Sequence, residues 1–93
     1  MSKLSEAQVS AELPALAGWE YAEGKLTLRI AARSYRDAQR LVNLAADIAE
    51  QQNHHPDITW TYDTLRIDLW SHDVSGLSER DFAFARAFQA SRQ

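Results

Sequence analysis

The chain has 93 residues, 45% hydrophobic and 25% charged, so a single domain with one small core is expected over residues 1–93. It lacks cysteine and has a formal net charge of −3, which excludes disulfides and thiolate chemistry and provides no overall positive field for nucleic acid. No stretch resembles a signal peptide or a membrane span, so we expect a cytoplasmic protein that binds neither nucleic acid directly nor a membrane.

The first third of the chain predicts a short helix and a hairpin. The helix covers residues 6–16, is interrupted by Pro14 and stops before Gly18. Two strands follow, over residues 19–22 and 25–30, and Glu23-Gly24 between them is a good two-residue turn. Apolar and polar residues alternate in the second strand, which indicates that one of its faces is buried.

The longest helix begins after Ser34, whose hydroxyl can cap the first turn, with Asp37 three residues on in a shortened capping-box pattern. It should run to about Gln52, because the residue before Pro56 is biased away from helical geometry. A second hairpin is expected over residues 58–62 and 65–71. Gly76 then breaks the chain, and a last helix opens at Ser78.

The predicted order is therefore α-β-β-α-β-β-α, a hairpin followed by a helix, used twice. Four antiparallel strands with helices packed on one face form the natural α+β architecture for this order. The opposite face of the sheet is then left for solvent, a ligand or another subunit.

All three histidines lie at the ends of predicted elements, which indicates an acid–base site. His54 and His55 follow the long helix, and His72 follows the last strand, two residues after Trp70 and on the same strand face. Capping and surface roles are the simpler alternatives for each histidine. A metal site that adds Asp57 or Asp73 is a further alternative, although no His-x-His or His-x-x-x-His pair is present.

Two carboxylates are candidates for orienting these imidazoles. Glu50 is one helical turn before His54 and can reach it, although a solvated glutamate is the usual reading of such a position. Asp81 occupies the third helical position after Ser78, where a carboxylate is favoured simply as part of the helix cap.

The spacing of these residues as a set resembles the signature of the pterin-4a-carbinolamine dehydratases. Glu50 is followed after three residues by His54-His55-Pro56, and then at fixed intervals by Tyr62, His72 and Asp81. Gly18-Trp19 before the first hairpin and Gly76-Leu77-Ser78-Glu79-Arg80-Asp81 at the last helix also match, so the resemblance covers nearly the whole chain.

This resemblance implies that the chain removes water from 4a-hydroxytetrahydrobiopterin to give the quinonoid dihydropterin in tetrahydrobiopterin recycling. No metal and no other cofactor is implied. His54 and His72 match the proton-transfer positions, and His55 matches a position that mainly holds the substrate. A pterin partner and a homodimer or homotetramer are also implied. The further site residues implied are Glu50 and Asp81 as orienting carboxylates, Trp19 at a pocket wall, Pro56 beside the histidines, and the Ser71, Asp73 and Val74 segment with His72 as the pterin-binding backbone.

The chain also departs from the family pattern. Many relatives have a small polar residue in place of Trp70, whose bulk narrows the pocket or belongs to a subunit contact, and Ser75 replaces a common glycine. Two other functions therefore stay open. One is a non-catalytic dimerisation or interaction protein of the same fold, and the other is action on a different pterin, such as a molybdopterin-pathway intermediate.

Overall fold

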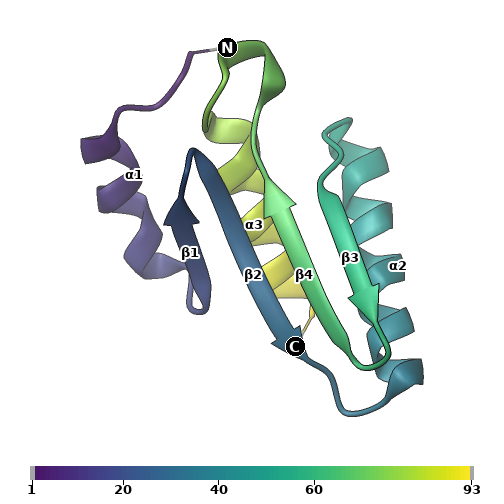
Figure 1. The fold of residues 1–93 in the computed structure, drawn as a ribbon. Coiled ribbons are helices and arrows are strands. Elements are labelled where there is room, and N and C mark those ends of the chain that lie inside the picture. Colours follow the sequence, from purple (N-terminus) through teal and green to yellow (C-terminus); the bar gives the residue numbers. More distant parts are fainter. Residues whose placement is uncertain (1, 93) are drawn as a thin grey trace.

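A computed structural model describes residues 2–92; the two terminal residues of the expected domain, Met1 and Gln93, lie outside the described residues. The predicted order of helices and strands is confirmed (Figure 1). The elements are α1 (Glu6–Glu12), β1 (Trp19–Ala22), β2 (Lys25–Ala31), α2 (Tyr35–Gln52), β3 (Asp57–Thr61), β4 (Thr64–Leu69) and α3 (Glu79–Ser91). None of the helices in the described range is long and apolar enough to cross a membrane.

The first helix is shorter than predicted. It begins with a capping box in which the Ser5 hydroxyl accepts the Gln8 N–H and the Gln8 side chain accepts the Ser5 N–H. It ends at Glu12, and a 3₁₀ turn over Leu13–Ala15 takes its place, because Pro14 has no N–H for an α-helical bond and is tolerated only in a first turn.

The four strands form one antiparallel sheet in the order β1-β2-β4-β3. The first hairpin turns at Glu23 and Gly24, both with positive φ (54° and 75°), as its sequence predicted. The second hairpin is shifted from the prediction. Tyr62 has a φ of 50° and belongs to the turn, and β4 ends at Leu69, two residues before Ser71.

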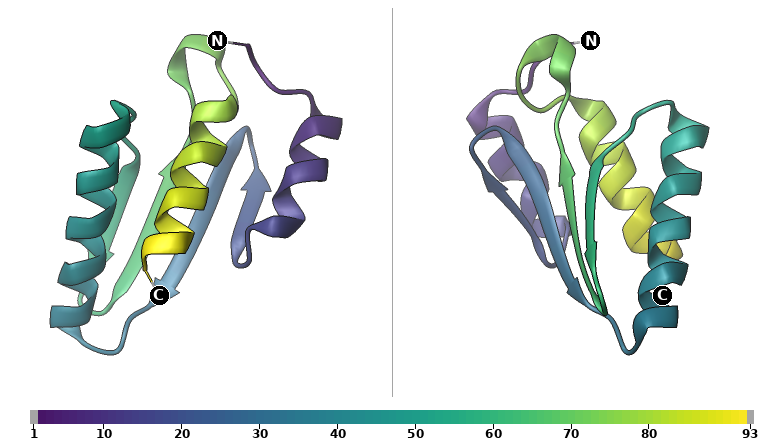
Figure 2. Two further views of the ribbon diagram at one scale, coloured as in Figure 1. Left: turned by 180° about the vertical axis from the view of Figure 1, so that it is seen from behind. Right: turned by 45° about the vertical axis from the view of Figure 1, so that its right-hand side comes forward.

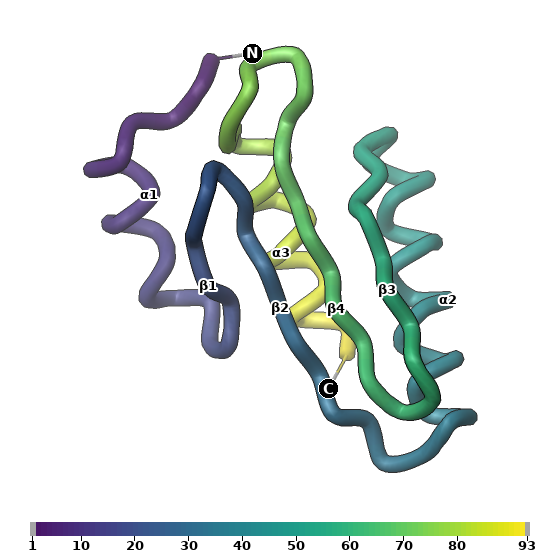
Figure 3. Tube along the Cα trace, in the orientation of Figure 1, coloured from purple at the N-terminus to yellow at the C-terminus, as the bar shows by residue number. Residues whose placement is uncertain are grey.

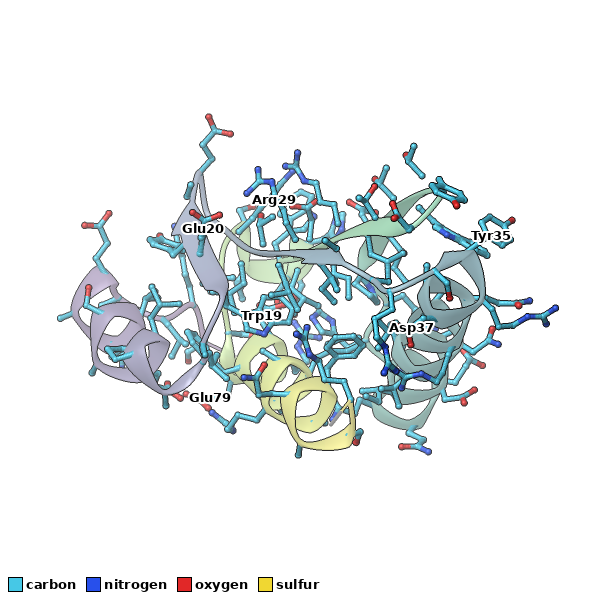
Figure 4. All side chains as sticks on the ribbon, turned by 90° about the horizontal axis from the view of Figure 1, so that it is seen from below. Trp19, Glu20, Arg29, Tyr35, Asp37 and Glu79 are labelled. Atoms are coloured by element: carbon cyan, nitrogen blue, oxygen red, sulfur yellow. The ribbon has the colours of Figure 1, made fainter. Side chains whose placement is uncertain are left out.

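All three helices cover one face of the sheet, as predicted (Figure 2). The core between the layers is apolar, and Trp19 points into it from β1 (Figure 4). Its largest fully buried apolar side chains come from the sheet and from α3: Leu26, Ile67, Leu69, Phe82, Phe84 and Phe88.

The other face of the sheet is polar, and Glu20 and Arg29 project from it (Figure 4). Thr27 and Asp68 pair across β2 and β4, and the Thr27 hydroxyl donates to the Asp68 carboxylate at 2.7 Å. Arg66 donates to the same carboxylate at 3.0 Å. Asp68, a buried carboxylate on this face, is therefore held by hydrogen bonds from its neighbours in the sheet.

Candidate active site

The three histidines meet at one end of the molecule. His54 and His55 follow α2, His72 follows β4, and both connecting segments reach the same end of the chain trace (Figure 3). They line a pocket of about 480 Å³ whose other lining residues are Ser71, Asp73 and Arg80. A larger hollow of about 640 Å³ lies along the start of α2, but its lining contains no histidine, so the smaller pocket is the candidate for acid–base chemistry.

The end of α2 turns the two adjacent histidines in different directions. Asn53 adopts left-handed geometry (φ 50°, ψ 44°), which asparagine tolerates better than most residues. The His54 N–H then donates back to the Ala49 carbonyl at 3.0 Å, which closes the helix. Beyond this reversal the His54 side chain is buried, whereas that of His55 is exposed.

His54 is bonded to a fully buried carboxylate. Its Nε2 lies 2.5 Å from Asp81 Oδ1, and the two side chains are 9% and 0% exposed. The second oxygen of Asp81 accepts the Ser78 N–H at 3.0 Å and the Ser71 hydroxyl at 2.8 Å. Asp81 therefore both caps α3 and contacts His54. The capping role and the contact with a histidine, which the sequence presented as alternatives, are both present.

Glu50 was expected to reach His54, and that pairing is wrong. Its Oε2 lies 2.6 Å from Nε2 of His55 instead. The rule that residues four apart are neighbours holds only along a continuous helix, and the left-handed turn at Asn53 breaks it. Because these side chains are 58% and 80% exposed, the pair is far more hydrated than that of His54 and Asp81.

In a neutral histidine, a carboxylate on Nε2 fixes the proton on that nitrogen. A carboxylate can only accept, so Nε2 donates and Nδ1 is left with its lone pair. His54 and His55 both make this Nε2 contact. In its neutral form each therefore presents Nδ1 as a hydrogen-bond acceptor.

The third histidine has a different environment. His72 begins a short 3₁₀ helix (His72–Val74) and is exposed. Within residues 2–92 its ring nitrogens have no hydrogen-bond partner, but its ring lies 3.9 Å from that of Trp70, centroid to centroid, at an interplanar angle of 38°. The expectation that these two side chains share a face is confirmed.

Arg80 is a pocket residue that the sequence reasoning missed. Its guanidinium pairs with Asp73 at the mouth of the pocket, and this hydrogen bond holds the pKa of the Asp73 carboxyl below its usual range. The available signal was a cation in the first turn of α3, one position before Asp81. That signal is weak, because such an arginine is normally solvated.

Some backbone groups of the loop after β4 form hydrogen bonds within the loop, and others are free of any partner among residues 2–92. Ser71 exchanges hydrogen bonds with Gly76, and the Val74 N–H donates to the Ser71 carbonyl at 3.2 Å. Within the described part of the chain, the His72 N–H and the Asp73 and Val74 carbonyls have no partner. A donor and two acceptors are therefore open for a ligand in this segment.

Besides the two orienting carboxylates, three residues expected to contact the substrate do not line this pocket in the structure of the single chain: Trp19, Pro56 and Val74. Trp19 is only 4% exposed and belongs to the core. The strand register puts it in one row with Leu28 and Ile67, and Ile67 precedes Ser71 by four residues, or about 13 Å along an extended chain. Its assignment to a pocket wall stays a prediction.

No group of three or more histidine, aspartate or glutamate side chains in residues 2–92 is arranged to hold a metal ion. The metal alternative therefore has no ligand set in this range. Two of the three imidazoles instead use their Nε2 atoms to contact carboxylates.

Fold and site define a class: a small α+β protein in which a histidine pair at a helix end faces a third histidine at a strand end. A family model described as pterin 4 alpha carbinolamine dehydratase matches residues 2–91. The chain belongs to this family, and the resemblance read from its sequence is confirmed.

Individual relatives agree with this assignment. A protein of Thermomicrobium roseum named "Putative pterin-4-alpha-carbinolamine dehydratase" is 36% identical over 86 residues, which cover 92% of each chain. A protein of the same name from Stenotrophomonas maltophilia is 40% identical over 85 residues, covering 89% of this chain and 73% of the relative.

Two solved structures are also similar. One, described as a transcriptional coactivator/pterin dehydratase from Brucella melitensis, superposes with a TM-score of 0.91 at 28% identity, covering 95% of this chain and 96% of that chain. The other is described as a pterin dehydratase-like protein that is a RuBisCO assembly factor in the alpha-carboxysome. Its TM-score is 0.64 at 25% identity, covering 77% of this chain and 83% of that chain.

Proposed function

We propose that the protein is a 4a-hydroxytetrahydrobiopterin dehydratase. The observation that carries this proposal is the meeting of His54, His55 and His72 around one pocket in a chain of the dehydratase family. The reaction breaks the C4a–O bond of the carbinolamine and removes the proton of N5. A C4a=N5 double bond forms, and the products are water and the quinonoid dihydropterin.

The proposed roles divide the two proton transfers between imidazoles. One of His54 and His72 delivers a proton to the departing C4a hydroxyl as general acid, and the other takes the N5 proton as general base. Each transfer by a positioned group typically accelerates a reaction by roughly 10²–10⁴-fold. His55, with its exposed ring and its partner Glu50, mainly holds the substrate.

The substrate's amide edge is proposed to bind the backbone after β4. A pterin offers a ring N–H beside a carbonyl oxygen, which match a backbone acceptor and a backbone donor. The unpartnered His72 N–H and the Asp73 and Val74 carbonyls support this assignment. Bound there, the substrate would lie next to the His72 ring.

We also propose the cellular setting implied by the resemblance. The protein is cytoplasmic, acts in tetrahydrobiopterin recycling without a metal or other cofactor, and forms a homodimer or homotetramer. We further propose that residues 1–93 form a single domain.

The likeness to a RuBisCO assembly factor favours a second candidate, a protein-binding function on the same fold. Such a function has no need of three imidazoles around one pocket. It would therefore survive their substitution, whereas a dehydratase would not.

The test is stopped-flow absorbance of 4a-hydroxytetrahydrobiopterin decay, with the substrate generated in situ by a hydroxylase. The wild-type protein should accelerate the decay, and the double variant His54→Ala, His72→Ala should not. Gln51→Ala, an exposed change near the same end of α2, is the matched control and should retain full activity. A folded wild-type protein without acceleration would reject the dehydratase, and turnover of other pterins in the same assay would then identify the alternative substrate.

A further inference from the structure

The ring of Trp70 contacts the ring of His72, and the proposed mechanism gives Trp70 no role. His54 and His55 are each held by a carboxylate, whereas the ring of His72 has no hydrogen bond to any described residue. The rings of Trp70 and His72 lie 3.9 Å apart, centroid to centroid, in a tilted contact with an interplanar angle of 38°. Among the three imidazoles of the pocket, His72 is thus oriented by an aromatic ring rather than by a hydrogen bond.

The backbone between the two rings fixes this arrangement. Ser71 is 1% exposed, forms an isolated bridge with Gly76, and donates its hydroxyl to Asp81 at 2.8 Å. Because Ser71 is anchored inward, residues 70 and 72 on either side of it emerge on the other side of the chain. Their rings therefore meet without a turn between them.

Trp70 is itself positioned by ring contacts. Its indole nitrogen is buried and has no hydrogen-bond partner within the described residues, so no hydrogen bond of this group holds the ring. The Lys25 ammonium lies 5.5 Å from the ring centroid, within the range of a cation–π contact. Lys25 and His72 thus both contact the ring of Trp70.

We propose that Trp70 is a positioning residue that holds the His72 imidazole at the pocket through this tilted ring contact. This contact uses the face of the imidazole and leaves both of its nitrogens free to exchange protons, which a hydrogen-bonding partner would not do. The consequence for turnover rests on the proposed dehydratase function. The contact between the two rings does not depend on that function.

The expected catalytic effect follows from the strength of such a contact. An exposed imidazole without partners samples several side-chain rotamers, and an aromatic pair of ordinary strength raises the population of one of them by roughly 2- to 10-fold. Trp70→Thr should therefore lower kcat by roughly 2- to 10-fold and leave KM nearly unchanged. Trp70→Phe, which keeps an aromatic face, should restore most of kcat.

The deciding experiment is NMR of the histidine ring protons at one fixed pH, with the His72 signals assigned by their loss in His72→Gln. The indole ring current should shift the His72 ring protons upfield in the wild type. Trp70→Thr should return them to the positions of a free histidine, and Trp70→Phe should retain part of the shift. The matched control is Trp60→Phe, a tryptophan that stacks on Tyr35 instead, and it should leave the His72 signals unchanged.

Unshifted His72 signals in the wild type, or signals unaffected by Trp70→Thr, would overturn the proposal whatever the activity. Equal losses of kcat in the Phe and Thr variants would also overturn it. An inactive wild type with shifted His72 signals would instead reject the dehydratase and leave the contact between Trp70 and His72 supported, so the two failures are distinguishable.

Discussion

At the scale of single residues, the two adjacent histidines differ in environment: the carboxylate partner of His54 is buried and that of His55 is exposed. The side chains of His54 and Asp81 are 9% and 0% exposed, whereas those of His55 and Glu50 are 58% and 80% exposed. An exposed contact of this kind typically contributes about 0–1 kcal/mol even when both groups are charged, because solvent screens it. A buried carboxylate has lost its hydration and depends fully on its protein partners.

Replacing these two carboxylates should therefore have unequal effects on stability. Asp81→Asn keeps one acceptor oxygen and replaces the other with an NH2 donor, so it breaks either the contact with His54 or the hydrogen bonds from Ser71 and Ser78. It should lower the free energy of unfolding by about 2–3 kcal/mol, because a buried polar group is left without its partner. Glu50→Gln should lower it by less than about 0.5 kcal/mol. Urea denaturation of the two matched carboxylate-to-amide variants measures both values.

Glu50→Gln should also reduce turnover less than His54→Ala does, because Glu50 only orients His55. Similar losses of stability for the two amide variants would mean that burial does not separate these pairs. A turnover loss for Glu50→Gln larger than that for His54→Ala would make Glu50 a direct participant.

At the scale of elements, the C-terminus of α2 orients two histidines of the site, and its N-terminus caps the helix that carries them. The left-handed Asn53 at its C-terminus directs His54 and His55 into different environments. At its N-terminus the Ser34 hydroxyl accepts the Asp37 N–H at 3.0 Å. The Asp37 carboxylate accepts the N–H of Arg33 at 3.1 Å, so the capping box is displaced by one residue from the predicted pattern.

This cap predicts a pH-dependent contribution to stability. The backbone hydrogen bond from Arg33 and then that from the Arg40 side chain lower the pKa of Asp37 from 3.8 to about 2. A depressed pKa stabilises the folded state above the unfolded value, and the contribution disappears as the pH falls through the folded value. Asp37→Asn should therefore lower the Tm at pH 6, and the difference from wild type should shrink between about pH 4 and pH 2.

Thermal unfolding followed by circular dichroism across this pH range measures the effect. Asp47→Asn, an exposed change further along the same helix, is the control and should leave the Tm nearly unchanged. A Tm difference for Asp37→Asn that stays constant from pH 6 to pH 2 would show that the carboxylate charge does not contribute through the cap.

At the scale of the whole molecule, one face of the sheet is covered and the other is open. The open face carries its own hydrogen-bonded charges, such as Asp68 with Thr27 and Arg66. Burial alone would raise the pKa of Asp68, but these hydrogen bonds and the nearby charges of Arg66 and Lys25 together lower it. On this polar face the Asp68 carboxylate is thus stabilised in its charged form by its neighbours.

A chain of this size buries a modest core, so association that covers more surface would stabilise it. We expect sedimentation velocity at micromolar concentration to give a homodimer or homotetramer. A monomer throughout the micromolar range would contradict this expectation, and a monomer that retained full activity would also show that the pocket is complete within one chain.

Much of the architecture was predictable because it depends on local sequence. Period-2 alternation, the Glu23-Gly24 turn and the serine caps each act over a few residues, and together they predicted the strands, the helices and their order. The misplaced strand boundaries lie where the alternation continues past the strand, as at Tyr62 and Ser71. There a positive φ or an anchoring hydrogen bond, neither visible in composition, ends the strand.

The sequence by itself determined the element order, the family and the presence of three histidines and two carboxylates at fixed spacings. Only the tertiary structure decided which of them meet: Asp81 with His54, and Glu50 with His55. Arg80 also entered the pocket only at this level. The physical reason is that such contacts depend on how a helix end, a strand end and a second helix are packed together, and one left-handed residue at a helix end redirects the side chains that follow it.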